Sequence, residues 1–387
     1  MSNFTKAELE RYSRHLIIPQ FGLKGQSKLK ESKVLVVGTG GLGAPLLQYL
    51  TAAGIGTIGI VDFDIVEDSN LQRQVLFSTE DIGRPKVEAA AQRLRSQNPH
   101  VKFKLYNERL TSENALEIFK DYDIVADGTD NFPTRYLVND ACVKLGKVNV
   151  YASIFRFEGQ VSVFNFKDSN GVYGPNFRDL FPSPPPPGLV PSCAEGGVIG
   201  VLPGIVGSLQ ANEVIKVASG VGEPLSGRLF TIDASAFETR IFNLAKNPGH
   251  HIRTENSQEI ELIDYEQFCG IGVNLEQKTE EVVKSITVSE LKEKIDKQED
   301  LQIIDVREPY EYEIANIKGE LIPKNTVLEN VEHFDTERPV IVHCRSGKRS
   351  ADVIRLLEEK YGFSNLYNLE GGILAYADEI DQSLAKY

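Results

Sequence analysis

The chain has 387 residues, of which 41% are hydrophobic and 25% charged, a balance typical of globular proteins rather than disordered ones. That length suggests two or three domains. The formal net charge of -13 disfavours nonspecific nucleic-acid binding, because phosphates need cations. The sequence shows no signal peptide and no apolar run of roughly 18 residues, so we expect a cytoplasmic protein without membrane attachment.

Four cysteines occur in the chain, which is too few for a disulfide scaffold. They are Cys142, Cys193, Cys269 and Cys344, and no two of them form a C-x-x-C pair. A zinc site built from two such pairs is therefore impossible within one chain. Most free cysteines are buried small hydrophobic residues, so a chemical role needs further support from neighbouring residues.

The first two thirds of the sequence alternate short β-branched runs with helical periods. Strands are expected at residues 34–37, 57–61, 122–126 and 148–151, helices at 44–53 and after Pro85, and antiparallel strands within 160–166 and 228–244. Alternation of strands and helices predicts a doubly wound, Rossmann-like α/β sheet. We assign residues 1–265 to this domain.

The remaining sequence predicts a linker and a second domain. Residues 266–284 are rich in polar and charged residues and are assigned to the linker. Short apolar runs at 301–304 and 340–343 and a helical period at 350–361 predict a small α/β domain over residues 285–387.

A glycine-rich loop follows the first predicted strand. Gly38-Thr-Gly40-Gly41-Leu-Gly43 lies between that strand and a helix, where backbone N–H groups and the helix N-terminus can bind phosphate. Asp62 ends the next strand, where a ribose-binding carboxylate is expected. These features indicate a nucleotide site, and a NAD-dependent oxidoreductase is the default alternative.

Cationic and carboxylate residues further along the chain favour a triphosphate over a nicotinamide cofactor. Arg73 and Lys86 follow Asp62 closely, and cations of this kind neutralise phosphates. Asp130 and Asn131 follow a later strand that should end at the same edge of the sheet. A carboxylate there suits Mg²⁺, which binds through one or two carboxylates and phosphate oxygens.

These residues resemble the MoeB/ThiF-type adenylating enzymes, relatives of the ubiquitin-activating enzymes. The resemblance covers roughly residues 4–250 and rests on Arg11-Tyr-Ser-Arg14, Gly25-Gln26, the loop 38–43, residues 70–74, Lys86 and Asp130-Asn131. It implies that ATP adenylates the C-terminal Gly-Gly carboxylate of a ubiquitin-like sulfur carrier protein. It also implies that Asp62 binds the ribose, that Asn70, Arg73 and Lys86 hold the triphosphate, and that Asp130 holds Mg²⁺. Arg14 would reach the partner subunit's site in a homodimer.

The same resemblance draws attention to one cysteine that is present and four that are missing. Cys193 follows the proline run 184–187, where the family carries a reactive loop cysteine that forms a thioester or resolves a disulfide. The family's zinc cysteines correspond to Asn176, Asp179, His250 and Arg253. An arginine does not ligate a divalent cation, so we expect no structural zinc. A substitute site of Asp179, His250 and His251 is the alternative.

A second reactive loop lies in the C-terminal domain. Cys344-Arg345-Ser346-Gly347-Lys348-Arg349 follows a strand and leads into a helix. Its N–H groups, the helix N-terminus and its three cations favour a thiolate or persulfide. Cysteine-dependent phosphatases have five residues between Cys and Arg, whereas four separate Cys344 from Arg349. The shorter loop resembles a rhodanese sulfurtransferase domain over roughly residues 285–387.

With both domain resemblances, the chain is similar to the MoeZ-type fusion enzymes. They imply that a persulfide on Cys344 attacks the acyl-adenylate and that a thiocarboxylate results, with Cys193 as a candidate resolving thiol. The sulfur donor would be thiosulfate or a cysteine desulfurase. Molybdopterin, thiamine, cysteine and tRNA thiolation pathways stay open, as does a scaffold that binds the carrier without chemistry.

Overall fold

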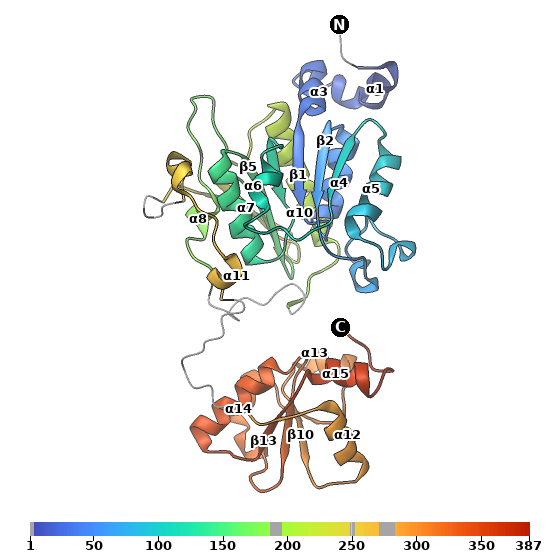
Figure 1. Ribbon diagram of the computed structural model, residues 1–387, viewed down its shortest axis with the longest axis vertical. Coiled ribbons are helices and arrows are strands. Elements are labelled where there is room, and N and C mark those ends of the chain that lie inside the picture. Colours follow the sequence, from blue (N-terminus) through green and yellow to red (C-terminus); the bar gives the residue numbers. More distant parts are fainter. Residues whose placement is uncertain (1–3, 186–195, 248, 250–251, 271–282) are drawn as a thin grey trace. The chain divides into compact units, whose positions relative to one another are not determined.

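The computed structural model describes residues 4–185, 196–247, 249, 252–270 and 283–387. The chain divides into two compact units, Met1–Asn274 and Leu275–Tyr387 (Figure 1). None of the helices formed by the described residues is long and apolar enough to cross a membrane. Each unit is described by itself below.

The first unit contains an eight-stranded sheet in the order β3-β2-β1-β4-β5-β6-β7-β8. The strands are β1 (Lys33–Val37), β2 (Thr57–Val61), β3 (Lys102–Tyr106), β4 (Ile124–Asp127), β5 (Val148–Phe155), β6 (Glu158–Phe164), β7 (Arg228–Asp233) and β8 (Glu238–Asn243). Pairing is parallel from β3 to β5 and antiparallel from β5 to β8. The carboxyl ends of the parallel strands therefore meet at one edge.

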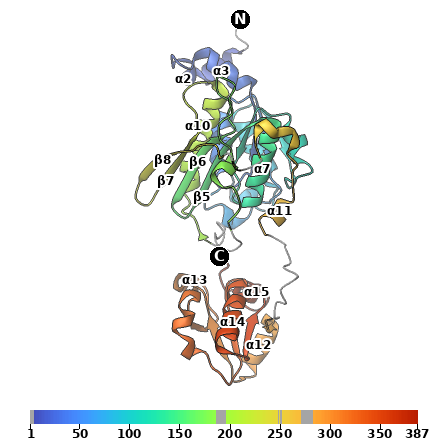
Figure 2. The same ribbon diagram turned by 90° about the vertical axis from the view of Figure 1, so that its left-hand side faces the viewer.

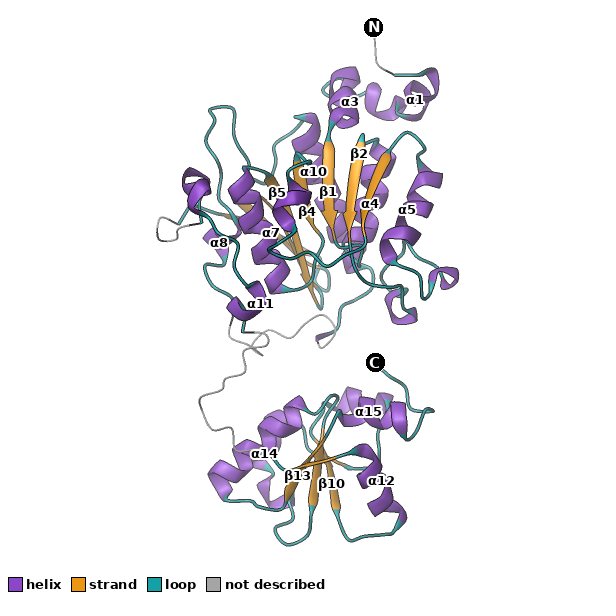
Figure 3. Ribbon diagram, in the orientation of Figure 1, coloured by secondary structure: helices purple, strands orange, loops and turns teal. Residues whose placement is uncertain are grey.

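Helices cover both faces of this sheet, as Figures 2 and 3 show. They are α1 (Lys6–Arg11), α2 (Ser13–Leu16), α3 (Gly22–Glu31), α4 (Gly43–Ala53), α5 (Lys86–Gln97), α6 (Ala115–Phe119), α7 (Phe132–Leu145), α8 (Phe177–Leu180), α10 (Leu202–Ser219) and α11 (Tyr265–Phe268). Single-turn 3₁₀ segments include Asp68–Asn70 and Thr79–Asp81.

Strand β1 shows why two helical layers are needed. Val34 and Val36 belong to one core with residues of α4, α5 and α10, whereas Leu35 and Val37 belong to another with residues of α6 and α7. Successive side chains of a strand point to opposite faces, so a fully apolar strand must be covered on both sides. The doubly wound fold expected from the sequence is confirmed.

The first unit extends past the boundary expected at residue 265. Residues 265–268 form α11, and the buried Tyr265 and Cys269 join the core beside α6 and α7. Part of the segment assigned to the linker is therefore core. Cys142 lies in the same core, and burial raises the pKa of both thiols, that of Cys269 to about 11.

A buried ion pair fixes α8 and α11 to α7. Arg178 donates from Nε and Nη2 to the two carboxylate oxygens of Asp140, at 2.9 and 2.7 Å. The Tyr265 hydroxyl donates to Asp140 Oδ2 at 2.8 Å. The guanidinium also lies over the rings of Tyr136 and Phe268, 4.9 and 4.8 Å from their centroids. Both charges are thus desolvated but fully partnered.

The second unit is a five-stranded parallel sheet in the order β11-β10-β12-β13-β9. Its elements are β9 (Ser285–Ile286), α12 (Val288–Asp296), β10 (Gln302–Asp305), α13 (Pro309–Ile314), β11 (Glu320–Leu321), β12 (Val340–His343), α14 (Lys348–Tyr361), β13 (Leu366–Leu369) and α15 (Gly372–Glu379). Strand β12 is central and fully buried, so its carboxyl end is held between two neighbouring strands.

Replacing Arg178 by Met should destabilise the first unit by about 3–5 kcal/mol, because Asp140 then stays buried without its cation. Urea unfolding followed by circular dichroism measures this loss. Arg240→Met is the matched control, because the Arg240–Glu238 pair is exposed and worth at most about 1 kcal/mol. Equal losses in the two variants would contradict the structural role of the buried pair.

Candidate active sites

A cavity of about 1140 Å³ lies at the carboxyl edge of the first sheet. It is lined by the loops that follow β1, β2 and β4. Nine of the eleven predicted nucleotide-binding residues line it: Gly38, Gly40, Gly41, Asp62, Asn70, Arg73, Lys86, Asp130 and Asn131. Parallel strand order brings these residues together from a span of almost one hundred positions.

The glycine loop is held tightly against the start of α4. Gly38 has a φ of +91°, a conformation that L side chains rarely adopt. A Cβ atom on Gly43 would lie 2.0 Å from the Gly38 carbonyl oxygen, so only glycine fits there. Gly43 does not line the cavity itself. It lets the helix N-terminus approach the loop, which presents backbone N–H groups to an anion.

Asp62 supports the glycine loop directly. Its Oδ2 accepts hydrogen bonds from the backbone N–H and the hydroxyl of Thr39, at 2.7 and 2.6 Å. Its Oδ1 accepts from the N–H of Asp64 at 2.9 Å. Each carboxylate oxygen has two lone pairs, so Oδ1 retains capacity for a ribose hydroxyl. Asp62 therefore orders the glycine loop in addition to any contact that it makes with the nucleotide.

The two predicted cations differ in their surroundings. Lys86 begins α5 and is 5% exposed, and its Nζ donates to Asp64 Oδ2 at 3.0 Å. Arg73 is partly exposed, and its Nη1 donates to the Ser69 carbonyl at 3.1 Å. Both charges face the cavity. A bound triphosphate would compete with Asp64 for Lys86.

Asp130 fits the expected magnesium ligand. It is exposed in the cavity, and within the described residues its carboxylate has no hydrogen-bond or ion-pair partner. Asn131 instead caps α7, because its Oδ1 accepts from the Thr134 N–H at 3.0 Å. The neighbouring Asp127 is fully buried, and burial raises its pKa. Asp130 is thus the carboxylate of this loop that is available to a cation.

One wall of the cavity was not predicted from the sequence. It is formed by residues 262–266, the last of which falls within the segment assigned to the linker. Arg109 donates to Glu266 Oε1 at 2.8 Å and lies over the Phe63 ring, 4.6 Å from its centroid. Arg109 and Glu266 are 157 positions apart, so no local motif marks the contact.

Two further predicted residues lie outside this cavity. Arg14 is exposed on α2 and does not line the pocket of its own chain. Cys193 lies outside the described residues. Their roles remain predictions.

Hydrogen bonds join the two segments that correspond to the zinc-binding segments of the family, although the cysteines are absent. Asn176 is buried and donates from Nδ2 to the Ile252 carbonyl at 3.0 Å. Asp179 Oδ1 accepts from the Asn247 N–H at 2.6 Å, and Arg253 Nη2 donates to the Asn247 carbonyl at 2.9 Å. The described residues contain no cluster of three metal-ligating side chains. His250 and His251, the alternative ligands, lie outside the described residues.

The second candidate site surrounds Cys344, directly after β12. The thiol is 1% exposed, and the Gly347 N–H donates to Sγ at 3.2 Å. The Ser350 hydroxyl lies 3.4 Å from Sγ. Gly347 has a φ of +91° and precedes α14, so its N–H points at Sγ from a helix N-terminus. Backbone donors of this kind stabilise a sulfur anion.

The loop cations are less available than expected from the sequence. Arg349 makes two hydrogen bonds with Glu311, from Nη1 to Oε2 at 2.6 Å and from Nη2 to Oε1 at 2.7 Å. Burial opposes ionisation of Glu311, but the hydrogen bonds from Arg349 hold its pKa below the usual value. Arg349 is therefore neutralised by a carboxylate and is not a free cation of the loop.

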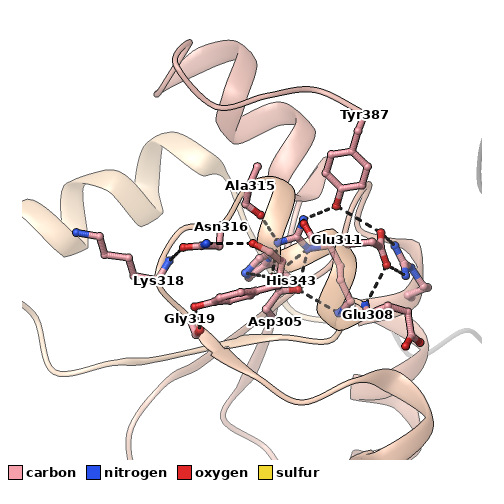
Figure 4. A network of polar contacts seen from close by, with 12 residues as sticks. Asp305, Glu308, Glu311, Ala315, Asn316, Lys318, Gly319, His343 and Tyr387 are labelled. Carbon is pink, nitrogen blue, oxygen red and sulfur yellow. Dashed lines mark hydrogen bonds and ion pairs between the residues drawn. The ribbon is translucent and has the colours of Figure 1, made fainter. Parts of the chain in front are cut away.

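A buried polar network surrounds Asp305 and His343, which are paired at the ends of β10 and β12 (Figure 4). Arg307 donates from Nε to both carboxylate oxygens of Asp305, at 2.9 and 3.0 Å, and from Nη2 to the Ala315 carbonyl at 2.8 Å. His343 is fully buried with Nε2 3.6 Å from Asp305 Oδ2. Burial lowers the pKa of His343 to about 4, so the imidazole is neutral at pH 7.

The two sites define a two-domain enzyme with a nucleotide pocket and a cysteine anion loop. The model of the ThiF family matches residues 12–252, and the model of the rhodanese-like domain matches residues 287–379. The chain therefore belongs to the ThiF family and carries a C-terminal rhodanese-like domain. The fusion recognised in the sequence is confirmed.

Relatives resemble the chain over its full length. A probable adenylyltransferase/sulfurtransferase MoeZ from Mycobacterium tuberculosis is 46% identical and is matched over 100% of this chain and 97% of its own. A sulfur carrier protein adenylyltransferase from Thermus thermophilus is 54% identical over 69% of this chain and 99% of its own. The solved structure of E. coli MccB with MccA-N7isoASN shares the fold, with 22% identity, a TM-score of 0.56 and coverage of 65% and 75% of the two chains. The chain is accordingly an adenylyltransferase and sulfurtransferase.

Gly43→Ala should weaken ATP binding at least about tenfold, because the new methyl group forces the glycine loop away from α4. Isothermal titration calorimetry with ATP measures the affinity. Gly204→Ala is the control, since a Cβ there meets no atom within 4 Å. An unchanged affinity in the Gly43 variant would show that the loop does not bind the triphosphate.

Proposed function

We propose that the chain adenylates the C-terminal Gly-Gly carboxylate of a ubiquitin-like sulfur carrier protein and converts it to a thiocarboxylate. The observation that carries this proposal is the presence in one chain of two anion-binding loops at strand ends. One lines a nucleotide-sized cavity, and the other holds a cysteine thiol against a backbone N–H. The names of the relatives from Mycobacterium tuberculosis and Thermus thermophilus agree with both halves of the reaction.

Adenylation needs charge neutralisation rather than a general base. A terminal carboxylate has a pKa of about 3.5 and is already ionised at pH 7. Its oxygen attacks the α-phosphorus of ATP, the bond to the bridging oxygen breaks, and pyrophosphate leaves. Lys86 and Arg73 reduce the repulsion between the two anions, and the loop 38–43 fixes the phosphates. Mg²⁺ bound by Asp130 and phosphate oxygens would supply further positive charge.

Sulfur transfer uses the acyl-adenylate as the electrophile. The terminal sulfur of a Cys344 persulfide anion attacks the acyl carbon, AMP leaves, and an acyl disulfide forms. A second thiolate then attacks Cys344 Sγ and expels the carrier as its thiocarboxylate, leaving a protein disulfide for an external dithiol to reduce. Cys193 is our candidate for that second thiol. Thiosulfate or the persulfide of a cysteine desulfurase would reload Cys344.

Membership of the ThiF family disfavours a NAD-dependent oxidoreductase, the alternative open from the glycine loop. The buried Lys86 also favours a triphosphate, because a dinucleotide has no γ-phosphate for that cation to hold. A scaffold that only binds the carrier does not need a thiol that accepts a backbone hydrogen bond, as the Cys344 thiol does.

Cys344→Ala should abolish thiocarboxylate formation and retain carrier-dependent ATP–pyrophosphate exchange, because the two steps use different units. Lys86→Ala should remove both activities, since sulfur transfer needs the adenylate. Isotope exchange measures the first step, and the mass of the carrier, which exchanges one oxygen for sulfur, measures the second. Lys104→Ala, which breaks an exposed pair with Asp121, serves as the control and should retain both. Loss of exchange in Cys344→Ala would argue against separate roles.

We further propose a homodimer in which Arg14 completes the site of the partner subunit. Arg14 is exposed and does not line the cavity of its own chain, which agrees with a contribution in trans. Arg14→Ala and Lys86→Ala should each be inactive in adenylation. Mixed and reassembled chains should regain about a quarter of wild-type exchange, because heterodimers then contain one intact site. No recovery in heterodimers verified by native mass spectrometry would contradict the proposal.

A further inference from the structure

A buried hydroxyl group faces the sulfur of Cys344 in addition to the backbone N–H of the loop. The Ser350 hydroxyl lies 3.4 Å from Sγ, and the Ser350 side chain is fully buried. Ser350 belongs to the first turn of α14, directly after the loop, so the helix sets its position relative to Sγ. Because a buried polar group pairs with the protein around it, the neighbours of this hydroxyl determine where its proton lies.

The Ser350 hydroxyl has more acceptors within reach than it has protons. Its Oγ lies 2.6 Å from Asn368 Oδ1, 3.2 Å from the Gly347 carbonyl oxygen and 3.4 Å from Cys344 Sγ. A hydroxyl carries one proton and two lone pairs, so it donates to one of these atoms at a time. The distance to Asn368 is the shortest, and the amide oxygen therefore holds the proton while Cys344 is a neutral thiol.

Asn368 reaches the cysteine loop from the neighbouring strand. It lies on β13, paired with Val342 of β12, and a Cβ atom on Gly347 would lie 3.5 Å from Asn368 Nδ2. Among the residues that the structure describes, Nδ2 makes no hydrogen bond. The amide can therefore turn and present Nδ2 to Ser350 without losing another partner. An asparagine offers both an acceptor and a donor, whereas a carboxylate offers acceptors only.

We propose that Ser350 and Asn368 form a hydrogen-bond relay that turns toward Cys344 whenever the cysteine sulfur is an anion. With the thiol, Ser350 donates to Asn368 Oδ1. With the thiolate, Ser350 donates to Sγ, and the turned amide of Asn368 donates to Ser350 Oγ. A hydrogen bond to a charged group is stronger than one between neutral groups, so the anion draws the proton to itself.

The relay rests on the sulfur transfer proposed above, in which Cys344 is a thiolate when it is reloaded. The thiolate attacks the sulfane sulfur of thiosulfate, the S–S bond of the donor breaks, and sulfite leaves with the bonding electron pair. The negative charge then lies on the outer sulfur of the persulfide, so the Ser350 proton can return to Asn368. The Gly347 N–H belongs to the backbone and cannot turn away, so the relay is the part of the site that follows the charge on Sγ.

Alkylation of Cys344 by iodoacetamide tests the relay without any sulfur transfer, because the thiolate is the reacting form. Peptide mass spectrometry measures the rate in the full chain. Ser350→Ala should lower the rate at pH 7 about tenfold, whereas Ser350→Thr keeps a hydroxyl and should retain most of it. Near pH 10, above the usual thiol pKa of about 8.5, Ser350→Ala should react within about twofold of the wild type. Ser364→Ala, at an exposed serine, is the control.

Substitutions of Asn368 test the turning of the relay. Asn368→Asp provides an acceptor that cannot donate, so it should retain the Ser350 proton, add a negative charge and lower the rate at pH 7 about thirtyfold. In the Ser350→Ala background the same substitution should lower the rate only about threefold, because the charge then acts alone. Asn368→Leu removes the competing acceptor and should leave the rate within about threefold of the wild type.

An unchanged rate in Ser350→Ala, or an equal loss from Asn368→Asp in the two backgrounds, overturns the relay. A loss in Ser350→Ala that is as large near pH 10 as at pH 7 also overturns it, because altered access to the thiol would then be the cause. Failure of thiosulfate to load Cys344 in the wild type, with the alkylation rates as expected, counts against thiosulfate as donor while supporting the relay.

Discussion

Both sites depend on the same backbone constraint, a sharp turn from a buried parallel strand into a helix. Gly38 and Gly347 each make this turn with a φ of +91°. A Cβ on Gly38 would lie 3.1 Å from the Gly128 carbonyl oxygen, and one on Gly347 would lie 3.2 Å from that of Leu369. Each glycine thus packs against the end of the neighbouring strand. The turn leaves backbone N–H groups at a helix N-terminus, which attract phosphate in one unit and a sulfur anion in the other.

The cations at the two sites share a second feature, because the buried Lys86 and the Arg349 side chain, which is 33% exposed, each have a carboxylate partner. Lys86 is paired with Asp64, and Arg349 with Glu311. An isolated buried cation would cost several kcal/mol of desolvation, so pairing allows these charges to exist in the free enzyme. The backbone N–H groups of the two loops add positive potential without adding a buried charge. Local cations and backbone donors explain how a chain with a net charge of -13 can bind ATP.

The fold and most of each reactive loop could be predicted from the sequence, because they depend on local patterns. Each pattern is short: a β-branched run, the glycine loop and the Cys344 loop each span about ten residues or fewer. Parallel strand order then places the carboxyl ends of the strands at one edge of each sheet. Contacts between distant segments could not be predicted in this way. Arg109 and Glu266 are 157 positions apart, and Tyr387 and Glu311 are 76 apart. The Glu311–Arg349 ion pair joins α13 to α14 and spans 38 positions.

The chain lacks the family's zinc cysteines, and hydrogen bonds join the two segments that correspond to the zinc-binding ones. Asn176 and Ile252 are 76 positions apart, so joining them costs loop entropy that some favourable contact must offset. Zinc would supply that contact through four ligands, whereas here Asn176 and Asp179 bond to backbone groups of the facing segment, and Arg253 bonds to the Asn247 carbonyl within its own segment. Backbone partners cannot be lost by substitution, and these bonds need no metal. The Arg178–Asp140 pair then adds a buried anchor beside Asn176, so α8 is fixed from both sides. The nucleotide pocket benefits from the same anchor, because Tyr265 lines the cavity and bonds Asp140.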